Sequence, residues 1–350
     1  MIAQRASASR VDLVAGCRAS LLLAFLALLV PRLEAATFDV NNTADSGSNS
    51  LRDAISSATV GANTVAWAAG SGGQIDLLTE VAIADQTTLD VSAAPSSVTI
   101  AGSSLNLGGG VTLLNASVSQ PWKISSTIVG AGSMTKTGAG TLILTDSNSY
   151  AAGTFLNGGK LNIDNSSALG SGALTIDGGT LQTASTITFS NAITLAAGGG
   201  AIDTLGNNSV LSGVIDGGGS LTNVSTGTLT LTGVNTYAGG TFLSSGVLNV
   251  NGNAALGAAS GGLTFDGGTL QLAADMSSAR AITLTGDGAF DTNDNNLALS
   301  GVIGGAGGLS KLGLGTLTLS AANTYGGATT VNAGTLQLGI DDALPATTAL

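Results

Sequence analysis

Histidine is absent from this sequence of 350 residues, and cysteine occurs once, as Cys17. Histidine is the usual general base of hydrolytic triads and the commonest nitrogen ligand of zinc, so both kinds of site are excluded. A chain with a single cysteine forms no internal disulfide bond. These absences rule out most hydrolase and zinc centres before any motif is considered.

Charged residues are also scarce, because they make up 9% of the chain, against about a quarter in an average globular protein. The formal net charge is −11, and removal of residues 1–36 changes the balance to 6 − 19 = −13. An acidic chain with few, scattered cations cannot neutralise a phosphate backbone, so we expect no nucleic-acid partner. It also offers no basic patch to anionic lipids.

Glycine is abundant, with 53 residues, and the hydrophobic fraction reaches 43%. Enough apolar residues are present to build a core, which argues against disorder in spite of the low charge. Glycine, asparagine and serine favour tight turns. The composition therefore predicts β structure with many turns.

An apolar run of ten residues, Leu21–Val30, stands near the N-terminus. It is too short to cross a membrane, which takes about 20 residues, but it suits the apolar part of a signal peptide. The preceding region is positive through Arg5, Arg10 and Arg18. A cleavage point at Ala35–Ala36 makes residues 1–36 a predicted signal peptide. Cys17 precedes the apolar run, whereas a lipoprotein cysteine follows one, so Cys17 belongs to the removed leader.

Three segments of the chain repeat one another, namely 132–163, 219–250 and 307–338. Their tyrosines, Tyr150, Tyr237 and Tyr325, set the period at 237 − 150 = 87 and 325 − 237 = 88 residues. Self-similarity at a long, fixed period is the signature of a repeat architecture.

Short alternating runs fill each repeat, such as Thr141–Leu144, Lys160–Ile163 and Ala173–Ile176. Apolar residues at every second position predict strands. Strands this short do not form a free-standing sheet, but they bury a continuous core when they stack coil upon coil. We therefore predict an all-β, right-handed parallel β-helix, with residues 126–350 forming repeats of about four coils each.

These repeats resemble the autotransporter-associated β-strand repeat, also called the passenger-associated transport repeat. Its run G-x-L-x-K-x-G-x-G-T-L-x-L-x-x-x-N-T-Y-x-G-G-T is matched closely by Gly227–Thr241 and Gly315–Gly327, whereas the first copy departs at Ser149 and Ala152. The three segments cover 3 × 32 = 96 of the 350 residues. The resemblance implies a secreted, surface-exposed structural or adhesive passenger whose repeats form a rigid stalk and assist translocation.

The same resemblance implies an outer-membrane translocation barrel as partner, which we expect to lie outside this chain. It also implies a host or glycan surface as ligand, with no cofactor. A secreted polysaccharide-acting β-helix enzyme and a self-assembling surface or biofilm component are the alternatives.

Residues 37–125 differ from the repeats and are predicted to form an N-terminal cap and the first coils. Ser50 and Asp53 have the spacing of a capping box, and Leu51 and Ile55 share one helical face. The segment resembles the T-x-D-S-G-x-x-S-L-R-x-A-I motif that begins many extracellular bacterial β-helices. A short helix there covers the open strand edges of the first coil.

Asp287, Asp291 and Asp294 cluster closely enough to suggest a calcium loop. A calcium-binding β-helix repeats every nine residues, whereas here Asp203 and Asp291 recur one whole repeat apart. We therefore interpret these aspartates as turn residues and expect no metal site.

No catalytic constellation is found either. Lys136 and Lys311 occupy equivalent positions, but Asn223 replaces them in the middle copy, and Glu80 is the one glutamate after residue 36. Polysaccharide-cleaving sites need clustered carboxylates, and most aspartates here adjoin turn residues. We predict no catalytic residues and no enzyme.

The aromatic residues allow two interpretations. Tyr150, Tyr237 and Tyr325 form either a spaced ladder for stacking on glycans or buried corners in which each hydroxyl has a partner. We favour buried corners, since each tyrosine follows an asparagine turn. Trp67 and Trp122 occur once each and are interpreted as packing residues.

Overall fold

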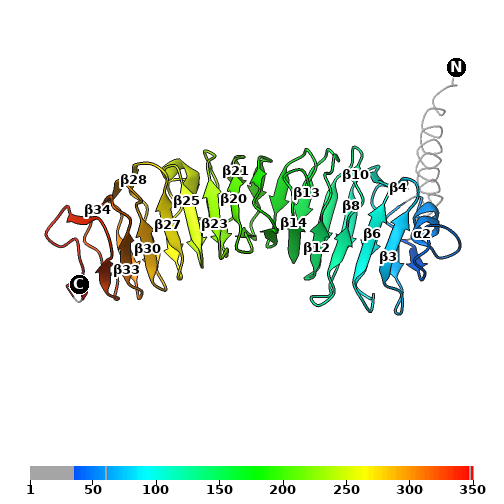
Figure 1. Cartoon of the computed structure of the whole chain (residues 1–350), viewed down its shortest axis with the longest axis horizontal. Coiled ribbons are helices and arrows are strands. Elements are labelled where there is room, and N and C mark those ends of the chain that lie inside the picture. The colour runs from blue at the N-terminus through cyan, green and yellow to red at the C-terminus, as the bar shows by residue number, and fades with distance from the viewer. Residues whose placement is uncertain (1–34, 60, 347, 350) are drawn as a thin grey trace, which may run out of the picture. The chain divides into compact units, whose positions relative to one another are not determined.

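The computed structural model describes residues 35–59, 61–346, 348 and 349, and within them the alternating runs are strands of two to five residues. Residues 1–34 of the predicted signal peptide lie outside the described residues. The chain from Ala36 onward is one structural unit, in which the strands stack side by side into a long solenoid (Figure 1). None of the helices among the described residues is long and apolar enough to span a membrane.

The strands form three faces around one core, and neighbouring strands on each face pair in parallel. Face 1 consists of β1 (Thr37–Val40), β2 (Thr64–Trp67), β5 (Thr88–Asp90), β8 (Val111–Leu114), β11 (Met134–Thr137), β13 (Thr154–Leu156), β15 (Leu174–Ile176), β18 (Ile193–Leu195), β21 (Ile215–Gly217), β28 (Met276–Ser278), β31 (Leu297–Leu299), β34 (Thr316–Leu319) and β36 (Thr335–Leu338).

Face 2 is one continuous sheet of β3 (Gly73–Leu77), β6 (Val98–Gly102), β9 (Trp122–Ile124), β12 (Thr141–Leu144), β14 (Lys160–Ile163), β16 (Thr180–Thr183), β19 (Gly200–Asp203), β22 (Leu221–Asn223), β24 (Thr241–Leu243), β26 (Leu263–Phe265), β29 (Ile282–Leu284) and β32 (Ile303–Gly305). Face 3 consists of β4 (Val81–Ile83), β7 (Leu105–Leu107), β10 (Ile128–Val129), β17 (Thr188–Phe189), β20 (Asn208–Leu211), β23 (Thr228–Leu231), β25 (Val247–Val250), β27 (Thr269–Leu272), β30 (Gly288–Asp291), β33 (Leu309–Leu312) and β35 (Thr329–Val331).

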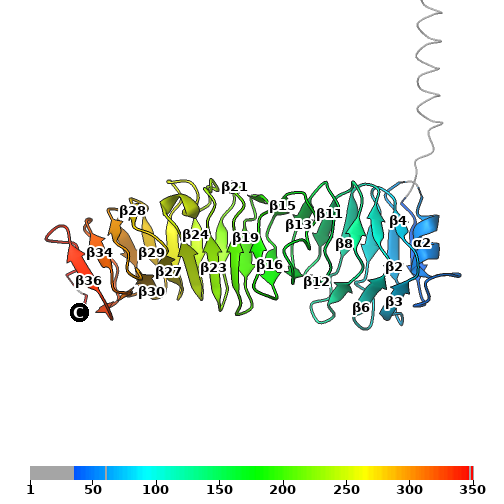
Figure 2. The ribbon, with the colours of Figure 1, turned by 45° about the horizontal axis from the view of Figure 1, so that its top comes forward.

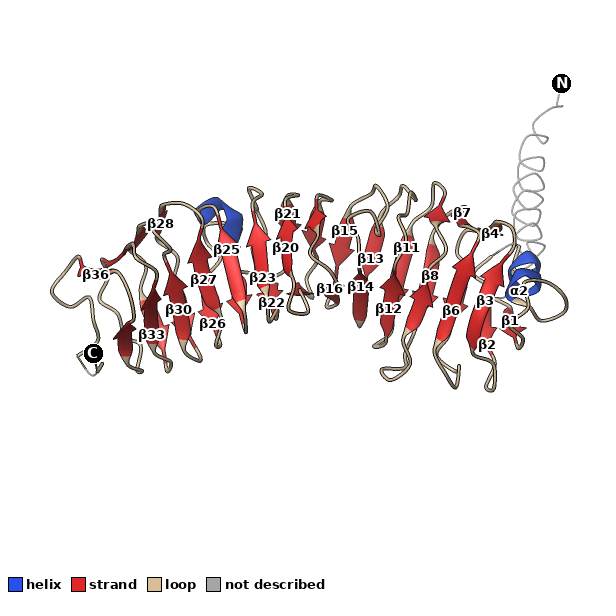
Figure 3. Cartoon of the chain, viewed as in Figure 1, coloured by secondary structure: helices blue, strands red, loops and turns tan. Residues whose placement is uncertain are grey.

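On faces 1 and 3 the ladder of strands is interrupted once, but backbone hydrogen bonds still join the coils on either side of the interruption. Face 3 is interrupted between β10 and β17, where Ser149 donates its N–H to Ile128 O at 2.9 Å. Face 1 is interrupted between β21 and β28, where Thr236 donates to Ile215 O at 2.8 Å. The short 3₁₀ helix η1 (Asn253–Leu256) lies at this second interruption (Figure 3). Both interruptions coincide with a tyrosine of the repeats.

One repeat advances the chain by four turns and one strand. On face 1, the order β11, β13, β15, β18 and β21 makes four turns, and the next strand along the chain is β22 on face 2. β11, β22 and β33 carry the equivalent residues Lys136, Asn223 and Lys311, and they lie on faces 1, 2 and 3. The predicted four coils per repeat are confirmed, and each repeat adds a further third of a turn.

The core is a column of inward side chains, because alternate residues of each strand point inward. In β12, for example, Leu142 and Leu144 are buried, while Thr141 and Ile143 between them are half-buried on the outer side. The stack runs from the N-terminal helix to β36 in both views (Figures 1 and 2). The predicted parallel β-helix is therefore confirmed.

The predicted capping helix is α2 (Leu51–Ser57), which packs against β1, β2 and β4 at the N-terminal end of the solenoid. Ser50 is its N-cap residue, and its Oγ accepts the N–H of Asp53 at 3.2 Å. Asp53 Oδ2 in turn accepts the N–H of Asn49 at 2.9 Å. Leu51 and Ile55 are buried, as their shared face predicts. The boundary placed after residue 125 stays a prediction.

The glycine of the repeated Gly-Thr-Leu sequence is required by the close approach of neighbouring coils. A methyl group at Gly140, Gly227 or Gly315 would overlap the carbonyl oxygen of Ser117, Asn207 or Asn295 in the preceding coil. The obstacle is backbone, so it cannot rotate away. Gly218, by contrast, has no atom within 4 Å of the position that a methyl group would take.

We expect Gly227→Ala to lower the free energy of unfolding by about 1–3 kcal/mol, the usual cost of inserting a methyl group into a packed region. Gly218→Ala is the matched control and should change stability by less than about 0.5 kcal/mol. Urea denaturation followed by circular dichroism measures both. Equal midpoints for the two variants would contradict the proposed overlap.

Candidate functional site

The asparagine and tyrosine of each repeat form a buried corner that joins three coils. In the second copy, Asn235 Oδ1 accepts the N–H of Ile215 at 2.8 Å, and Asn235 Nδ2 donates to Ala255 O at 2.6 Å. The Tyr237 hydroxyl lies 2.6 Å from Thr241 Oγ1. Burial raises the pKa of Tyr237 to about 12. One Asn-x-Tyr sequence thus connects the coil that it belongs to with the coils before and after it.

The other two copies repeat these contacts. Asn148 and Asn323 bridge to the coils on either side in the same way. Tyr150 and Tyr325 each lie 2.5 Å from a threonine hydroxyl. All three tyrosines are 0% exposed, so they cannot stack on a sugar. Our interpretation of the tyrosines as packed corners is confirmed.

The tyrosines also do not form a line along the solenoid. Tyr150 stacks on β10 of face 3, Tyr237 on β21 of face 1 and Tyr325 on β32 of face 2. This follows from the extra third of a turn in each repeat. An aromatic ladder for glycans is therefore excluded by position as well as by burial.

Lys136 and Lys311 point into the core and are both 0% exposed. Lys136 Nζ donates to Thr137 O at 2.7 Å and to Gly138 O at 2.8 Å. Lys311 Nζ makes the equivalent bonds to Leu312 O and Gly313 O at 2.8 and 2.7 Å. Each ammonium group thus satisfies carbonyls where the strand turns the corner.

Burial disfavours the charged form of both lysines. It lowers the pKa of Lys136 from 10.5 to about 8. The pKa of Lys311 is also lowered by desolvation, and the negative charge of Asp291 partly opposes this shift. In the middle copy, the buried amide of Asn223 donates to Ser245 O at 3.2 Å instead. An uncharged group therefore serves at this position.

The aspartates that were candidates for a calcium loop accept hydrogen bonds from backbone and side-chain amide groups. Asp291 Oδ1 accepts the N–H of Asn293 at 3.0 Å, and Asp203 Oδ1 accepts that of Leu205 at 2.9 Å. Asp287 Oδ1 accepts the N–H of Gly308 in the next coil at 2.7 Å. Asp203 and Asp291 are the last residues of β19 and β30, and their carboxylates accept N–H groups of the turns that follow, whereas Asp287 lies just before β30. Within residues 35–59, 61–346, 348 and 349, no three acidic, cysteine or histidine side chains gather in a way that could hold a metal ion.

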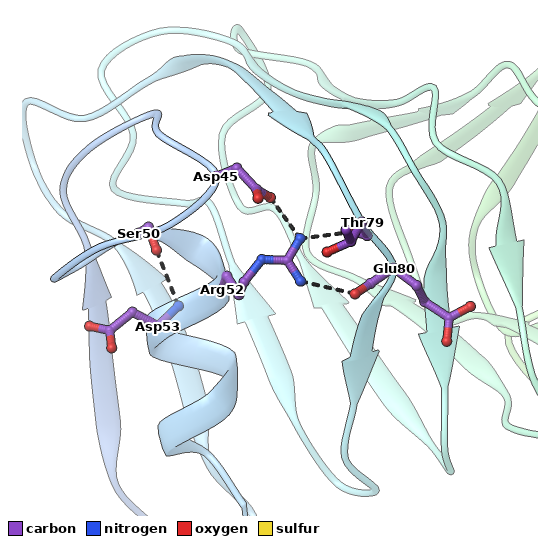
Figure 4. A network of polar contacts seen from close by, with 6 residues as sticks. All are labelled: Asp45, Ser50, Arg52, Asp53, Thr79 and Glu80. Atoms are coloured by element: carbon purple, nitrogen blue, oxygen red, sulfur yellow. Dashed lines mark hydrogen bonds and ion pairs between the residues drawn. The ribbon is translucent and has the colours of Figure 1, made fainter.

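The N-terminal cap is attached to the coils by Arg52 (Figure 4). Its Nη2 lies 2.7 Å from Asp45 Oδ1 and donates to Thr79 O at 2.8 Å, while Nη1 donates to Glu80 O at 2.9 Å. One side chain of α2 thereby joins the loop before the helix to the turn between β3 and β4.

Glu80 links the same turn to the next coil. Its carboxylate accepts hydrogen bonds from Asn106 Nδ2 at 2.9 Å and Ser104 Oγ at 3.0 Å, and these bonds lower the pKa of the carboxyl group.

Trp67 and Trp122 pack against each other inside the core, with ring centroids 6.0 Å apart. Their interpretation as packing residues is confirmed by exposures of 2% and 0%.

Two accessible aromatic residues were missed by the sequence reasoning. Phe155 in β13 and Phe242 in β24 point outward between inward neighbours, and they are 38% and 39% exposed. Their signal was a large apolar residue at an outward position of an alternating run.

The lowered pKa of Lys136 predicts a pH dependence of stability. Between about pH 8 and 10 the unfolded chain holds more protons at this residue than the folded chain does, so stability rises with pH. We expect wild type to gain stability relative to Lys136→Met as the pH is raised through this range. Urea unfolding at several pH values measures this difference in the free energy of unfolding. Both proteins contain the same tyrosines, so their contribution to the pH dependence cancels in the difference.

Lys123 on the outer side of β9 is exposed and provides the matched control. Replacement of Lys123 by Met should leave the pH dependence unchanged. Parallel curves for wild type and Lys136→Met would show that the buried ammonium group does not lose its proton in this range.

The repeats match a known protein family. The model of the passenger-associated-transport-repeat family matches residues 134–163, 216–250 and 309–338. The chain is also similar to the adhesin BmaC autotransporter of Brucella suis biovar 1 (strain 1330), with 35% identity over 190 residues. That alignment covers 51% of this chain but 5% of the relative. No solved structure matches the chain.

The family matches coincide with the coils that carry the buried corners, namely β11 to β14, β21 to β25 and β33 to β36. The resemblance drawn from the repeated motifs is therefore confirmed. The chain carries three passenger-associated-transport repeats, and about half of it is similar to part of an autotransporter adhesin.

Proposed function

We propose that this chain is a surface-exposed, non-enzymatic passenger that serves as a rigid stalk and as an adhesive surface. The observation that carries the proposal is the unbroken stack of coils, in which the conspicuous polar and aromatic side chains of the repeats are used for packing. Tyr237, Lys136 and Asp291 all contact backbone or neighbouring side chains. The alternative of a polysaccharide-cleaving enzyme is disfavoured because the candidate carboxylates serve turns.

The stalk role is supported by the regular pairing of each coil with the next. About 13 turns stack in the described part of the chain. At about 4.8 Å per turn they give a rod of roughly 60 Å. Backbone hydrogen bonds run along all three faces, so bending the rod requires them to be strained together.

The translocation role is supported by the local nature of the pairing. Thr141 pairs with Lys160, and Lys160 pairs with Thr180, so each coil binds a coil about 20 residues away. A chain that emerges gradually from an outer-membrane translocator, its proposed partner, can add one coil at a time to those already folded. Export to that membrane is proposed to depend on residues 1–36.

The adhesive role is supported by the name of the relative, which is an adhesin. The outer sides of the faces are accessible and carry mostly threonine and other uncharged residues. Such a surface contacts a host cell or a neutral glycan through uncharged hydrogen-bonding groups.

The test compares bacteria that produce the chain with a deletion strain. Antibodies raised against residues 37–350 should label intact producing cells, and the deletion strain should adhere less to an epithelial monolayer and to polysaccharide-coated glass. Complementation with the wild-type gene is the control for other effects of the deletion.

Labelling that appears only after the cells are permeabilised would overturn the surface location. Labelling of intact cells with unchanged adhesion would overturn the adhesive role. Reducing ends released from the immobilised polysaccharide by the purified chain would favour the enzyme instead.

A further inference from the structure

A column of threonines runs along the outer side of face 1. Their pairing places one threonine directly beside the next on neighbouring coils. The column comprises Thr37, Thr64, Thr88, Thr112, Thr135, Phe155, Thr175 and Thr194. The column ends where Thr194 pairs with Asp216, and one residue within it is not threonine. Phe155 takes its place between Thr135 and Thr175.

The same arrangement recurs on face 2. Phe242 pairs with Thr222 of the preceding coil and with Thr264 of the following coil. Phe155 and Phe242 are equivalent residues of the first and second repeats, and their exposures of 38% and 39% agree. Each ring thus lies partly open to solvent between two half-buried threonines. The third repeat has Thr330 at this position.

An exposed aspartate follows, by two residues, the threonine that pairs with each phenylalanine in the next coil. Asp177 follows β15 directly and donates its N–H to Leu156 O at 2.9 Å, next to Phe155. Asp266 follows β26 and donates to Leu243 O at 2.8 Å, next to Phe242. Both carboxylates belong to the coil after the phenylalanine, on the outer side. The Asp177 carboxylate accepts the N–H of Gly198 at 2.8 Å, so the two sites share one ring and two flanking threonines, with an aspartate nearby.

We propose that Phe155 and Phe242 are the centres of two equivalent contact sites for neutral polysaccharides. A sugar ring has an apolar face that packs on an aromatic ring, and its hydroxyls bond to threonine hydroxyls. A neutral glycan is favoured over an anionic one because Asp177 and Asp266 are negative and the chain carries a net charge of −11. This inference rests on the proposed adhesive function and names its ligand class.

The positions of the two sites determine how a polymer binds. They lie on different faces, since one repeat separates them by four turns and one strand. Their separation along the solenoid is about 20 Å, from about 4.8 Å per turn. A straight glycan chain on one face does not reach the other face, so each site holds its own chain. One protein molecule should then cross-link two polysaccharide chains.

The experiment uses the secreted chain and four soluble neutral polysaccharides, namely dextran, mannan, laminarin and galactan, with alginate as an anionic comparison. Titration calorimetry with short oligosaccharides of each polymer should find two sites per chain for at least one neutral glycan. Light scattering should rise when the corresponding long polymer is added, because the chain cross-links it.

The variants Phe155→Thr and Phe242→Thr introduce the residue that the third repeat already has at this position. Each should bind one oligosaccharide in place of two with unchanged affinity, and each should lose the scattering signal. The double variant should bind at least about tenfold more weakly. Val214→Thr is the matched control, because Val214 is an exposed apolar residue directly before β21.

Failure of the wild-type chain to bind any of the four neutral polymers would overturn the inference. Full binding by the double variant, or tighter binding to alginate, would also overturn it. Thermal midpoints of all variants show whether the fold is intact, and a threonine in a threonine column is expected to preserve it.

The adhesion assay separates this inference from the function on which it rests. If the double variant adheres to epithelial cells as well as wild type does, these sites are not the adhesive surface, although the adhesive function stands. If wild type itself does not adhere, the proposed function has failed independently of either phenylalanine.

Discussion

Parallel backbone pairing between coils about 20 residues apart is the constraint on which the other features depend. Because every strand must present its N–H and C=O groups to the coils before and after it, side chains can point only inward or outward. Inward positions are then filled by Leu and Ile, and corners must supply polar groups that continue the ladder. The buried Asn235, Tyr237 and Lys136 are explained by this requirement, and so are the glycines at which neighbouring coils come closest.

Much of this architecture could be predicted from the sequence because its signals are local. The alternation in Thr141–Leu144, the capping box at Ser50 and the recurring tyrosines each depend on a few neighbouring residues. The sites were harder to predict. The position of a residue around the solenoid depends on the summed length of all preceding turns, so no local pattern reveals which face Tyr150 or Tyr325 occupies.

The buried lysines show a second limit of sequence reasoning. A lysine in an alternating run is expected on the solvent side, yet Lys136 and Lys311 are inward. Their stems fill core space, while their ammonium groups reach carbonyls at the corner. The register of β11 and β33 with their neighbours determines how deeply each lysine is buried, and this burial lowers the pKa of each lysine. The same register leaves Phe155 and Phe242 outside.

The fractional turn in each repeat has a consequence for how such genes change in length. If recombination removes or duplicates one repeat, everything beyond the junction keeps its internal structure but rotates by about a third of a revolution about the long axis. Ligand-binding features on either side of the junction would then face new directions relative to one another. Only a change of three repeats restores the original orientation about the long axis. The number of repeats therefore determines the direction in which distal surfaces point as well as the length of the solenoid.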